Sequence, residues 1–452
     1  MVSERLYDAV SSPRTARPSP LSQKAKGGLE TASTQRVHAA GRELLKVALV
    51  GCGGRGTGAA SQILQASPAV RLWAMADVFS DRLEGALAML QNGVGARYDR
   101  QAHAGLASQI DVPPEQRFIG WDAYQKAIDS GVDAVILATT PHFRPMQFAY
   151  AVQRGVNAFL EKPVATDAPG VRQVLAAGRK AEKENLKVAA GFRRRHDAMY
   201  EEAMKRLHDG AIGRLTYLRT YFNHAAMWHI PRESSWSEME YQMRNWQHFS
   251  WASGDHTCEQ QAHSFHVVWW LLGKPPEKAV GMGGRQVVKG PDFGDVFDHH
   301  SVEFTYDDGL KLFAQCRQID ACWVQMAKFA HGTEGWCHLE QGRGGRIEDR
   351  SPWSHRKPVP NPYQVEQNLF VDAILNDKPC NEAELAASSS MMSVMARMAI
   401  YPGVEVTWDQ AFNSNVKPGP KTYAWDAEPP LEPAPNGTYE HAVPRPGVWR
   451  EI

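Results

Sequence analysis

A glutamate, a lysine and a proline stand together as Glu161-Lys162-Pro163, directly after the apolar run 156–160. A short apolar run predicts a buried strand. Lys162 would then lie at the carboxyl end of a strand, where open α/β sheets bind their ligands. An ammonium group at that place can stabilise negative charge that develops on a substrate oxygen. Glu161 and Lys162 are therefore candidate site residues.

A second set of chemically active side chains falls within the predicted helix 256–272. Glu259, His263 and His266 lie on one face of such a helix, within about 40° of each other. A carboxylate beside an imidazole raises the basicity of the ring and orients it, as a general base requires. We predict that Glu259 and His263 are catalytic and that His266 contacts the substrate. A solvated helix face with ordinary surface histidines would give the same spacing.

The same helix offers ligands for a metal ion as an alternative. Glu-x-x-x-His-x-x-His could bind zinc, with help from Asp298, His299 and His300. However, the order differs from H-E-x-x-H and no cysteine pair accompanies it. The residues from Asp298 begin a predicted strand, so their side chains alternate between faces and at most two reach one site. We therefore predict no metal and rank this interpretation below a base beside a nicotinamide.

A glycine-rich loop indicates which cofactor the lysine would face. Residues 51–56 follow the apolar strand 46–50, fit G-x-G-x-x-G and precede a helical stretch. The first glycine allows a tight turn, the second lets the backbone approach a pyrophosphate, and the third lets the helix pack closely. The helix N-terminus favours the negative charge. The predicted cofactor contacts in this loop are Gly51, Gly53, Gly54, Arg55 and Gly56.

An acidic residue follows at the distance expected for a ribose contact. Asp77 ends the apolar strand 70–76 and lies 21 residues after Gly56, close to the ~20 typical of the acid that binds the adenosine ribose. A carboxylate there repels a 2′-phosphate, so the sequence favours NAD over NADP. The alternative is that Asp77 only caps the helix that follows.

Two folding patterns must position these residues. Strands alternate with helices over 45–165, which predicts a doubly wound parallel sheet, the Rossmann type of α/β domain. Over 166–412, period-two alternation at 215–222 and hairpin signals at 307–309 and 332–335 predict a mainly antiparallel sheet. The second domain is thus predicted to be α+β, with a large open sheet that helices cover on one face.

The composition limits the classes of protein to which the chain can belong. The 452 residues carry 50 basic and 50 acidic side chains, a formal net charge of zero, which gives no electrostatic footprint for nucleic acid. No stretch is apolar enough to span a membrane, and the six cysteines lack a C-x-x-C pair, which favours reduced thiols. We predict a cytoplasmic protein without nucleic-acid or membrane partners. The 14 tryptophans fit sugar stacking and core packing equally well.

Both ends of the chain have the composition of irregular segments. Residues 1–44 are rich in Ser, Arg, Ala and Pro and are predicted to form a flexible arm. Residues 37–41 look like the end of an export signal, but no apolar segment or twin arginine precedes them, so no functional signal is predicted. The tail 413–452 is rich in Pro and Gly and is predicted to wrap the surface.

As a set, these motifs resemble the Gfo/Idh/MocA oxidoreductase family, over roughly residues 45 to 412. The glycine loop, Asp77, the Thr140-Pro141 step, the Glu161-Lys162-Pro163 stretch and the acid-x-x-x-His helix carry the resemblance. Members pair a Rossmann domain with an open-faced α/β domain and usually act on sugars or cyclitols. The resemblance implies that Thr140 and Pro141 contact the cofactor. It also implies that Lys162 lies near the nicotinamide and that His263 takes a hydroxyl proton while hydride leaves the carbon.

The chain departs from the family pattern at three positions, which bear on the substrate and the proton path. Glu259 and His266 both stand where the family usually has Asp, and Arg144 replaces the histidine common after the Thr-Pro step. Substrate contacts are predicted for a further set of residues, each of which a structural role would explain equally well: Trp228, His229, Tyr241, Arg244, Asp298, His299 and Arg317.

Three functions remain open at this point. The first is an NAD-dependent oxidoreductase that acts on a hydroxyl of a sugar, cyclitol or sugar glycoside. The second is a glycoside-cleaving enzyme that retains NAD, oxidises the sugar transiently, eliminates the aglycone, adds water and reduces again. The third, a non-catalytic binding protein, ranks last because Lys162 and His263 are both present. The resemblance also implies a homo-oligomer, a dimer or tetramer, that forms through the exposed face of the second sheet.

Overall fold

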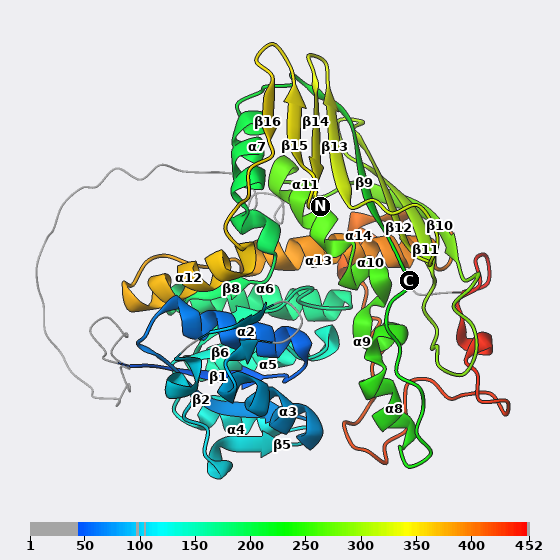
Figure 1. Ribbon diagram of the computed structural model, residues 1–452. Coiled ribbons are helices and arrows are strands. Elements are labelled where there is room, and N and C mark those ends of the chain that lie inside the picture. The colour runs from blue at the N-terminus through cyan, green and yellow to red at the C-terminus, as the bar shows by residue number, and fades with distance from the viewer. Residues whose placement is uncertain (1–43, 96–98, 104, 450–452) are drawn as a thin grey trace, which may run out of the picture. The chain divides into compact units, whose positions relative to one another are not determined.

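The computed structural model describes residues 44–95, 99–103 and 105–449. The predicted flexible arm, apart from its last residue, and the signal-like segment 37–41 therefore lie outside the described residues. Within the described ranges, no helix combines the length and apolar character that crossing a membrane requires. Two large sheets and the helices packed on them form the main parts of the described chain (Figure 1).

The first sheet is entirely parallel, as predicted. Its central strands are largely buried on both faces, which explains why they read as continuous apolar runs. Alternate side chains of β1 point into two separate cores: Leu45, Val47 and Leu49 into one, Ala48 and Val50 into the other. The strand order is β5 (Arg117–Ile119), β2 (Val70–Asp77), β1 (Leu45–Val50), β6 (Ala134–Leu137), β7 (Asn157–Leu160) and β8 (Val188–Ala190).

Helices cover both faces of this sheet. One core includes side chains of α2 (Gly54–Ala66), α3 (Ser80–Gln91) and α12 (Pro362–Leu375). The other core includes side chains of α4 (Ala123–Asp129), α5 (Arg144–Gln153) and α6 (Ala168–Lys183). A short ribbon of β3 (Val94–Gly95) and β4 (Asp99–Ala102) follows α3.

The parallel sheet continues past residue 165, where the sequence predicts the first domain to end. The strand expected at 186–191 as part of the second domain is β8, and it pairs in parallel with β7 through Ala158 and Val188. The chain therefore adds a sixth parallel strand after α6 before it turns to the second sheet.

The second sheet has nine strands and confirms the mainly antiparallel prediction. The one parallel pair joins β9 to β12, because β9 fills the gap between two meanders that follow it in the chain. The strand order is β16 (Trp353–His355), β15 (Gly344–Glu348), β14 (Trp336–Glu340), β13 (Ala327–Gly332), β9 (Leu215–His224), β12 (Lys311–Gln318), β11 (His299–Thr305), β10 (Lys278–Gly284) and β17 (Val406–Thr407).

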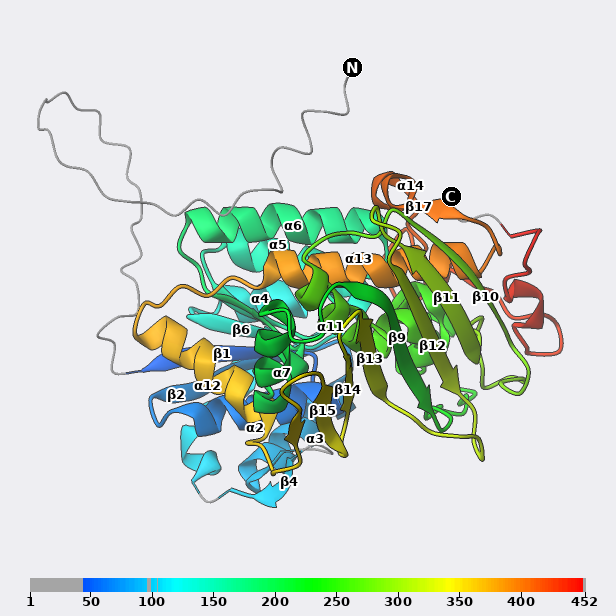
Figure 2. The ribbon, with the colours of Figure 1, turned by 90° about the horizontal axis from the view of Figure 1, so that it is seen from above.

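Helix α13 (Ala383–Ile400) lies between the two sheets (Figures 1 and 2). It packs against α6, against β8 of the first sheet, against β10 and β11 of the second sheet, and against α11 (Ala262–Leu272). Its buried serines are satisfied within the helix, since the hydroxyls of Ser389 and Ser390 donate to the carbonyls of Leu385 and Ala386. Small side chains thus allow one helix to serve as a close spacer for both sheets. Helices α7 (Ala198–His208) and α14 (Trp408–Asn413) complete this layer.

Residues 225–260 and the C-terminal tail form a third region with its own aromatic core. The first segment contains α8 (Glu238–Arg244), η5 (Trp246–His248), α9 (Ser250–Ser253) and α10 (Asp255–Glu259). In the tail, Tyr439 is fully buried, and Trp425 stacks on Phe79 with 5.2 Å between ring centroids. The tail therefore packs against the parallel-sheet half as well as against α8.

Candidate functional site

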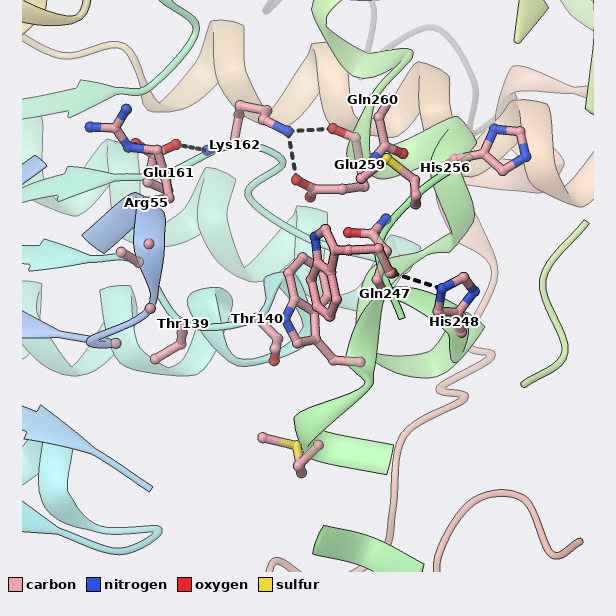
Figure 3. Close-up of a pocket in the computed structure, with 18 of the residues that line it drawn as sticks. Arg55, Thr139, Thr140, Glu161, Lys162, Gln247, His248, His256, Glu259 and Gln260 are labelled. Carbon is pink, nitrogen blue, oxygen red and sulfur yellow. Dashed lines mark hydrogen bonds and ion pairs between the residues drawn. The ribbon is translucent and has the colours of Figure 1, made fainter. Parts of the chain in front are cut away.

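A large cavity lies where the carboxyl ends of the parallel strands face residues 224–260. Its volume of about 1540 Å³ exceeds the roughly 300–1,000 Å³ of ordinary ligand pockets. This is enough for a dinucleotide together with a second small molecule. Many of the predicted site residues line it, and Figure 3 shows the part around Lys162.

The glycine loop has the backbone geometry that a dinucleotide requires. Gly51 has φ +95°, and a Cβ there would lie 2.5 Å from the carbonyl carbon of Ala138. A Cβ at Gly56 would lie 1.9 Å from the carbonyl oxygen of Gly51, whereas one at Gly53 would meet no atom within 4 Å. The first and third glycines therefore allow tight packing, and Gly53 leaves open space for a pyrophosphate at the start of α2.

Asp77 ends β2 and lines the cavity beside this loop. Its carboxylate accepts the backbone N–H of Cys52 at 2.6 Å and that of Phe79 at 2.9 Å. Burial raises the pKa of the Asp77 carboxyl, while these two hydrogen bonds oppose the rise. The bond to Phe79 lies just before α3, although no side chain caps that helix. The same carboxylate lines the cavity beside the glycine loop, so its contact with a ribose stays a prediction. Arg82, which the sequence did not single out, also lines this end.

Lys162 follows β7 and reaches across the cavity to α10 (Figure 3). Its ammonium donates to the Glu259 carboxylate at 2.7 Å and also to the Glu259 backbone carbonyl. The carboxylate that the sequence pairs with a histidine is thus bonded to the lysine. This ion pair links the parallel-sheet half to the segment in front of it.

The Glu161 carboxylate accepts the backbone N–H of Lys162 at 3.3 Å (Figure 3) and also faces Arg55 of the glycine loop. The carboxylate lies 3.0 Å from Nε of Arg55, whose guanidinium stacks over the Tyr363 ring at 4.5 Å. Arg144, placed behind the Thr-Pro step, donates to the carbonyls of Thr139 and Pro163. These bonds fix the ends of two adjacent strands, so Glu161, Arg55 and Arg144 hold the loops that surround Lys162.

The helix predicted over 256–272 is broken. Helix α10 ends at Glu259 and α11 begins at Ala262, with Gln260 and Gln261 between them. The break removes the common face that the sequence implies. Glu259 and His263 both line the cavity, but His266 lies elsewhere: its ring stacks on Phe192 at 4.1 Å and its Nδ1 bonds Ser389 at 3.1 Å. The position of His266 contradicts the predicted substrate contact.

The electrostatic environment of His263 is the reverse of the expected one. Burial, followed by the positive charges of Arg194 and Lys162, holds the pKa of His263 well below its usual range. The sequence predicts a raised basicity from Glu259, but that carboxylate is bonded to Lys162 instead. His263 is therefore a neutral imidazole at neutral pH, with a ring nitrogen, Nδ1, that bonds no described protein group.

Four of the predicted substrate contacts line the cavity: Trp228, His229, Arg244 and Asp298. Asp298 is committed to structure, because its carboxylate accepts the backbone N–H groups of Gln286, Val287 and Val288. Arg244 forms two 3.1 Å bonds with Asp81 and lies 4.0 Å over the Phe79 ring. Trp228 and His229 also line the cavity and stay predicted substrate contacts.

Three further predicted contacts do not line the cavity. The Tyr241 hydroxyl is buried and donates to the Pro291 carbonyl at 3.1 Å. Arg317 donates to the carbonyl of Trp323, and the His299 ring pairs with Asp298 at 2.7 Å. These side chains fix loops and strand ends, which corrects their assignment as substrate contacts.

Sequence reasoning missed several lining residues, notably Arg193, Gln260, Gln341 and Tyr363. Arg193 stacks over the Tyr363 ring at 4.8 Å, and Tyr363 is the second residue of α12. Asn361-Pro362 is a recognisable start signal for that helix. Nothing local, however, indicates that a helix so far along the chain returns to the first sheet.

The end of the cavity beside Asp77 is partly covered by side chains from distant parts of the chain. Arg244 of α8 covers Phe79, and Trp425 of the tail packs against both Phe79 and Trp121, the latter at 4.8 Å. All but Trp425 also line the cavity. A molecule bound along the glycine loop would therefore lie beside this partial aromatic cover.

Comparison with known proteins agrees with this geometry. Residues 45–192 match the sequence profile described as "Oxidoreductase family, NAD-binding Rossmann fold", and residues 200–338 match the GFO/IDH/MocA C-terminal domain. Together the two ranges cover more than half of the chain.

Individual relatives are more distant. A scyllo-inositol 2-dehydrogenase (NAD(+)) of Bacillus subtilis is 30% identical over 217 residues, 47% of this chain and 57% of the relative. A 2,7-anhydro-N-acetylneuraminate hydratase of Mediterraneibacter gnavus is 27% identical over 177 residues, 39% of this chain and 43% of the relative. The chain thus spans about half the length of the curated relatives it matches.

Solved structures add support for the fold alone. A levoglucosan dehydrogenase, in complex with NADH and levoglucosan, superposes with a TM-score of 0.63 at 14% identity, over 81% of this chain and 100% of that one. With both domain profiles matched in order and the site geometry in place, the chain belongs to the Gfo/Idh/MocA family of oxidoreductases with an NAD-binding Rossmann fold.

Proposed function

We propose that the protein is an NAD-dependent oxidoreductase that moves hydride between the nicotinamide and a hydroxyl-bearing carbon of a sugar, cyclitol or sugar glycoside. One observation carries the proposal: Lys162 and His263 line the same cavity as the glycine loop. The dinucleotide would be held by Gly53, Asp77 and Thr140, among the residues of that wall. When bound, its nicotinamide supplies the hydride acceptor or donor.

The residues of the chain supply binding and proton transfer. The neutral imidazole of His263 can accept the proton that leaves a substrate hydroxyl. The Lys162 ammonium, held by Glu259 at 2.7 Å, stabilises the negative charge that develops on the substrate oxygen. Glu259 thus acts as a positioning residue for the lysine.

A second candidate is the glycoside-cleaving cycle that retains NAD. The cover that Arg244 and Trp425 form over Phe79 favours it, because it would slow the exit of a dinucleotide. A relative that is named a hydratase points the same way, since hydration has no net oxidation.

Nicotinamide content separates the two candidates. We would denature the purified protein and measure released NAD(H), for wild type and for Arg244→Ala. Stoichiometric NAD(H) in the wild type, reduced in the variant, favours the retained cofactor, and aryl glycosides would then be screened for aglycone release without NADH. A protein that is purified without NAD(H) but binds added NAD favours a dehydrogenase that exchanges its cofactor. Oxidation of sugars and cyclitols would then be screened. Failure to bind either NAD or NADP would contradict both.

A homo-oligomer through the second sheet forms part of the proposal. One row across its outward face carries Val280, Glu303, Phe313 and Arg219, and Phe313 is 45% exposed. A second copy of the chain would bury the two apolar members of this row, Val280 and Phe313. Light scattering after gel filtration measures the state, and Phe313→Glu should shift an oligomer toward the monomer while the fold is retained.

A further inference from the structure

A buried cluster of one aspartate and two histidines lies at the wall of the cavity, on the side of α10. Asp255 and His256 begin α10, and His300 belongs to β11. One possible ligand atom from each residue lies within 4.8 Å of the other two. Oδ1 of Asp255 is 3.3 Å from Nε2 of His300 and 3.5 Å from Nε2 of His256. Figure 3 shows His256 beyond Gln260, on the far side of Glu259 from Lys162.

The Asp255 carboxylate is a buried charge without an ordinary counterion. Its side chain is fully buried, and among the described residues no lysine or arginine forms an ion pair with it. It accepts the backbone N–H groups of His256 and Phe297 and the hydroxyl of Tyr401. These neutral donors solvate the carboxylate but leave its charge in place. Buried charges in proteins are paired or bind metal ions.

His300 gives a second, independent indication. Its side chain is fully buried, and apart from the 3.3 Å approach of Nε2 to the Asp255 carboxylate, neither ring nitrogen has a hydrogen-bond partner in the described chain. Buried polar groups almost always have such a partner, and an exception needs an explanation. Here the unbonded Nε2 faces Asp255, so a cation bound by both groups would pair the carboxylate charge and occupy the free nitrogen.

The surroundings of His256 suit a metal ligand. Its Nδ1 lies 2.9 Å from Sγ of Cys316, and its Nε2 lies 3.0 Å from the carbonyl oxygen of Phe297. If Nε2 binds a metal, the ring carries its proton on Nδ1. That N–H can then donate a hydrogen bond to Sγ of Cys316. A partner of this kind behind the ring fixes the tautomer of metal-binding histidines. Without a metal, Nε2 can carry the proton and donate a hydrogen bond to the carbonyl oxygen of Phe297.

We propose that Asp255, His256 and His300 bind a divalent transition-metal ion, with zinc as the first candidate. Two imidazoles and one carboxylate form a common ligand set for zinc. Ligands about 2.0–2.1 Å from a tetrahedral zinc stand about 3.3–3.4 Å apart, close to the 3.3 and 3.5 Å between the Asp255 oxygen and the two ring nitrogens. The ion would tie α10 to β11 and so fix the segment that ends at Glu259.

The test is the metal content of the full chain. Protein as isolated, and protein stripped with a chelator and reloaded with zinc, would be gel filtered and analysed by mass spectrometry for metals. One equivalent of zinc per chain is expected, with a higher melting temperature after reloading. Cobalt in place of zinc should give the visible absorption of a site with fewer than six ligands.

Matched variants separate the site from adventitious binding. His300→Ala should reduce the bound zinc at least tenfold. The control is His299→Ala, which changes the adjacent, half-exposed histidine of β11 and should keep the zinc. If His300→Ala does not fold, stripping and reloading of the wild type decides alone. Zinc that fails to bind stoichiometrically to reloaded wild type, or that His300→Ala retains, overturns the proposal. Metal content is measured without substrate, so this outcome is independent of the proposed oxidoreductase activity.

Discussion

The two walls of the cavity are built in different ways. The wall from the parallel sheet consists of backbone turns, in which Gly51 and Gly56 leave no room for a Cβ. The wall from residues 225–260 consists of side chains held by ring stacking and ion pairs, such as Arg244 on Phe79. A backbone wall is rigid and suits a cofactor of constant shape. A wall of side chains can change one residue at a time, so it is the place where substrate selectivity can vary.

Lys162 connects the two walls, and its loss should have the largest effect. Lys162→Ala removes the ammonium that stabilises the substrate oxygen, so we expect turnover to fall by about 10²–10⁴-fold. Steady-state kinetics with the substrate found in the screens, together with a melting curve, would measure it. Glu259→Gln keeps a hydrogen-bond acceptor for the lysine, so its turnover should fall less than that of Lys162→Ala. Equal losses in both variants would mean that the ion pair, and not the ammonium, is what matters.

Two glycine variants test the rigidity of the backbone wall. Gly56→Ala places a methyl group 1.9 Å from the Gly51 carbonyl oxygen, so the free energy of unfolding should drop by about 1–3 kcal/mol. Gly53→Ala meets no protein atom within 4 Å and should change stability by less than about 0.5 kcal/mol, yet it should weaken NADH binding. Denaturant unfolding and NADH titration measure the pair. Normal NADH binding by Gly53→Ala would remove the loop from the cofactor site.

His248 tests the wall of side chains through its pH dependence. Burial lowers the pKa of His248 to about 4, below the ~6.5 of the unfolded chain. The unfolded state therefore binds a proton first, and stability should fall as the pH drops from about 6.5 to 4, by up to about 3 kcal/mol. Urea unfolding at several pH values measures this. His248→Gln should flatten that part of the curve, and an unchanged slope would assign the loss to other buried histidines.

Asp77 lines the cavity beside the glycine loop, where we propose the ribose contact, and we expect its effect to be the smallest. Asp77→Ala should weaken NADH binding about tenfold, the value of one lost hydrogen bond, and narrow the preference for NADH over NADPH. Arg82→Ala is the matched change at the same end of the cavity and should weaken the binding of NADPH instead. An unchanged preference in Asp77→Ala would leave Asp77 only its bonds to Cys52 and Phe79.

Sequence reasoning succeeded where a local rule decides the structure. Gly51, Gly53 and Asp77 belong to one β1–α2–β2 unit, so their spacing was enough to predict that they lie at the same cavity. Their contacts with a cofactor stay predictions. It failed at His266, because the break at Gln260–Gln261 depends on what surrounds α10 and not on the periodicity of the segment. The pairing of Glu259 with Lys162 joins residues 97 apart in the chain. No pattern in either segment encodes that partner.

Helix α13 has a consequence for how the molecule unfolds. Its small side chains join one continuous apolar core that includes Val50 and Leu137 of the first sheet and Val302 and Leu312 of the second. Separating the sheets would expose that core to water, which costs about 25 cal/mol for each Å² of apolar surface. The two sheets should therefore melt in a single calorimetric transition, and neither half should persist as a folded fragment once the other has been lost.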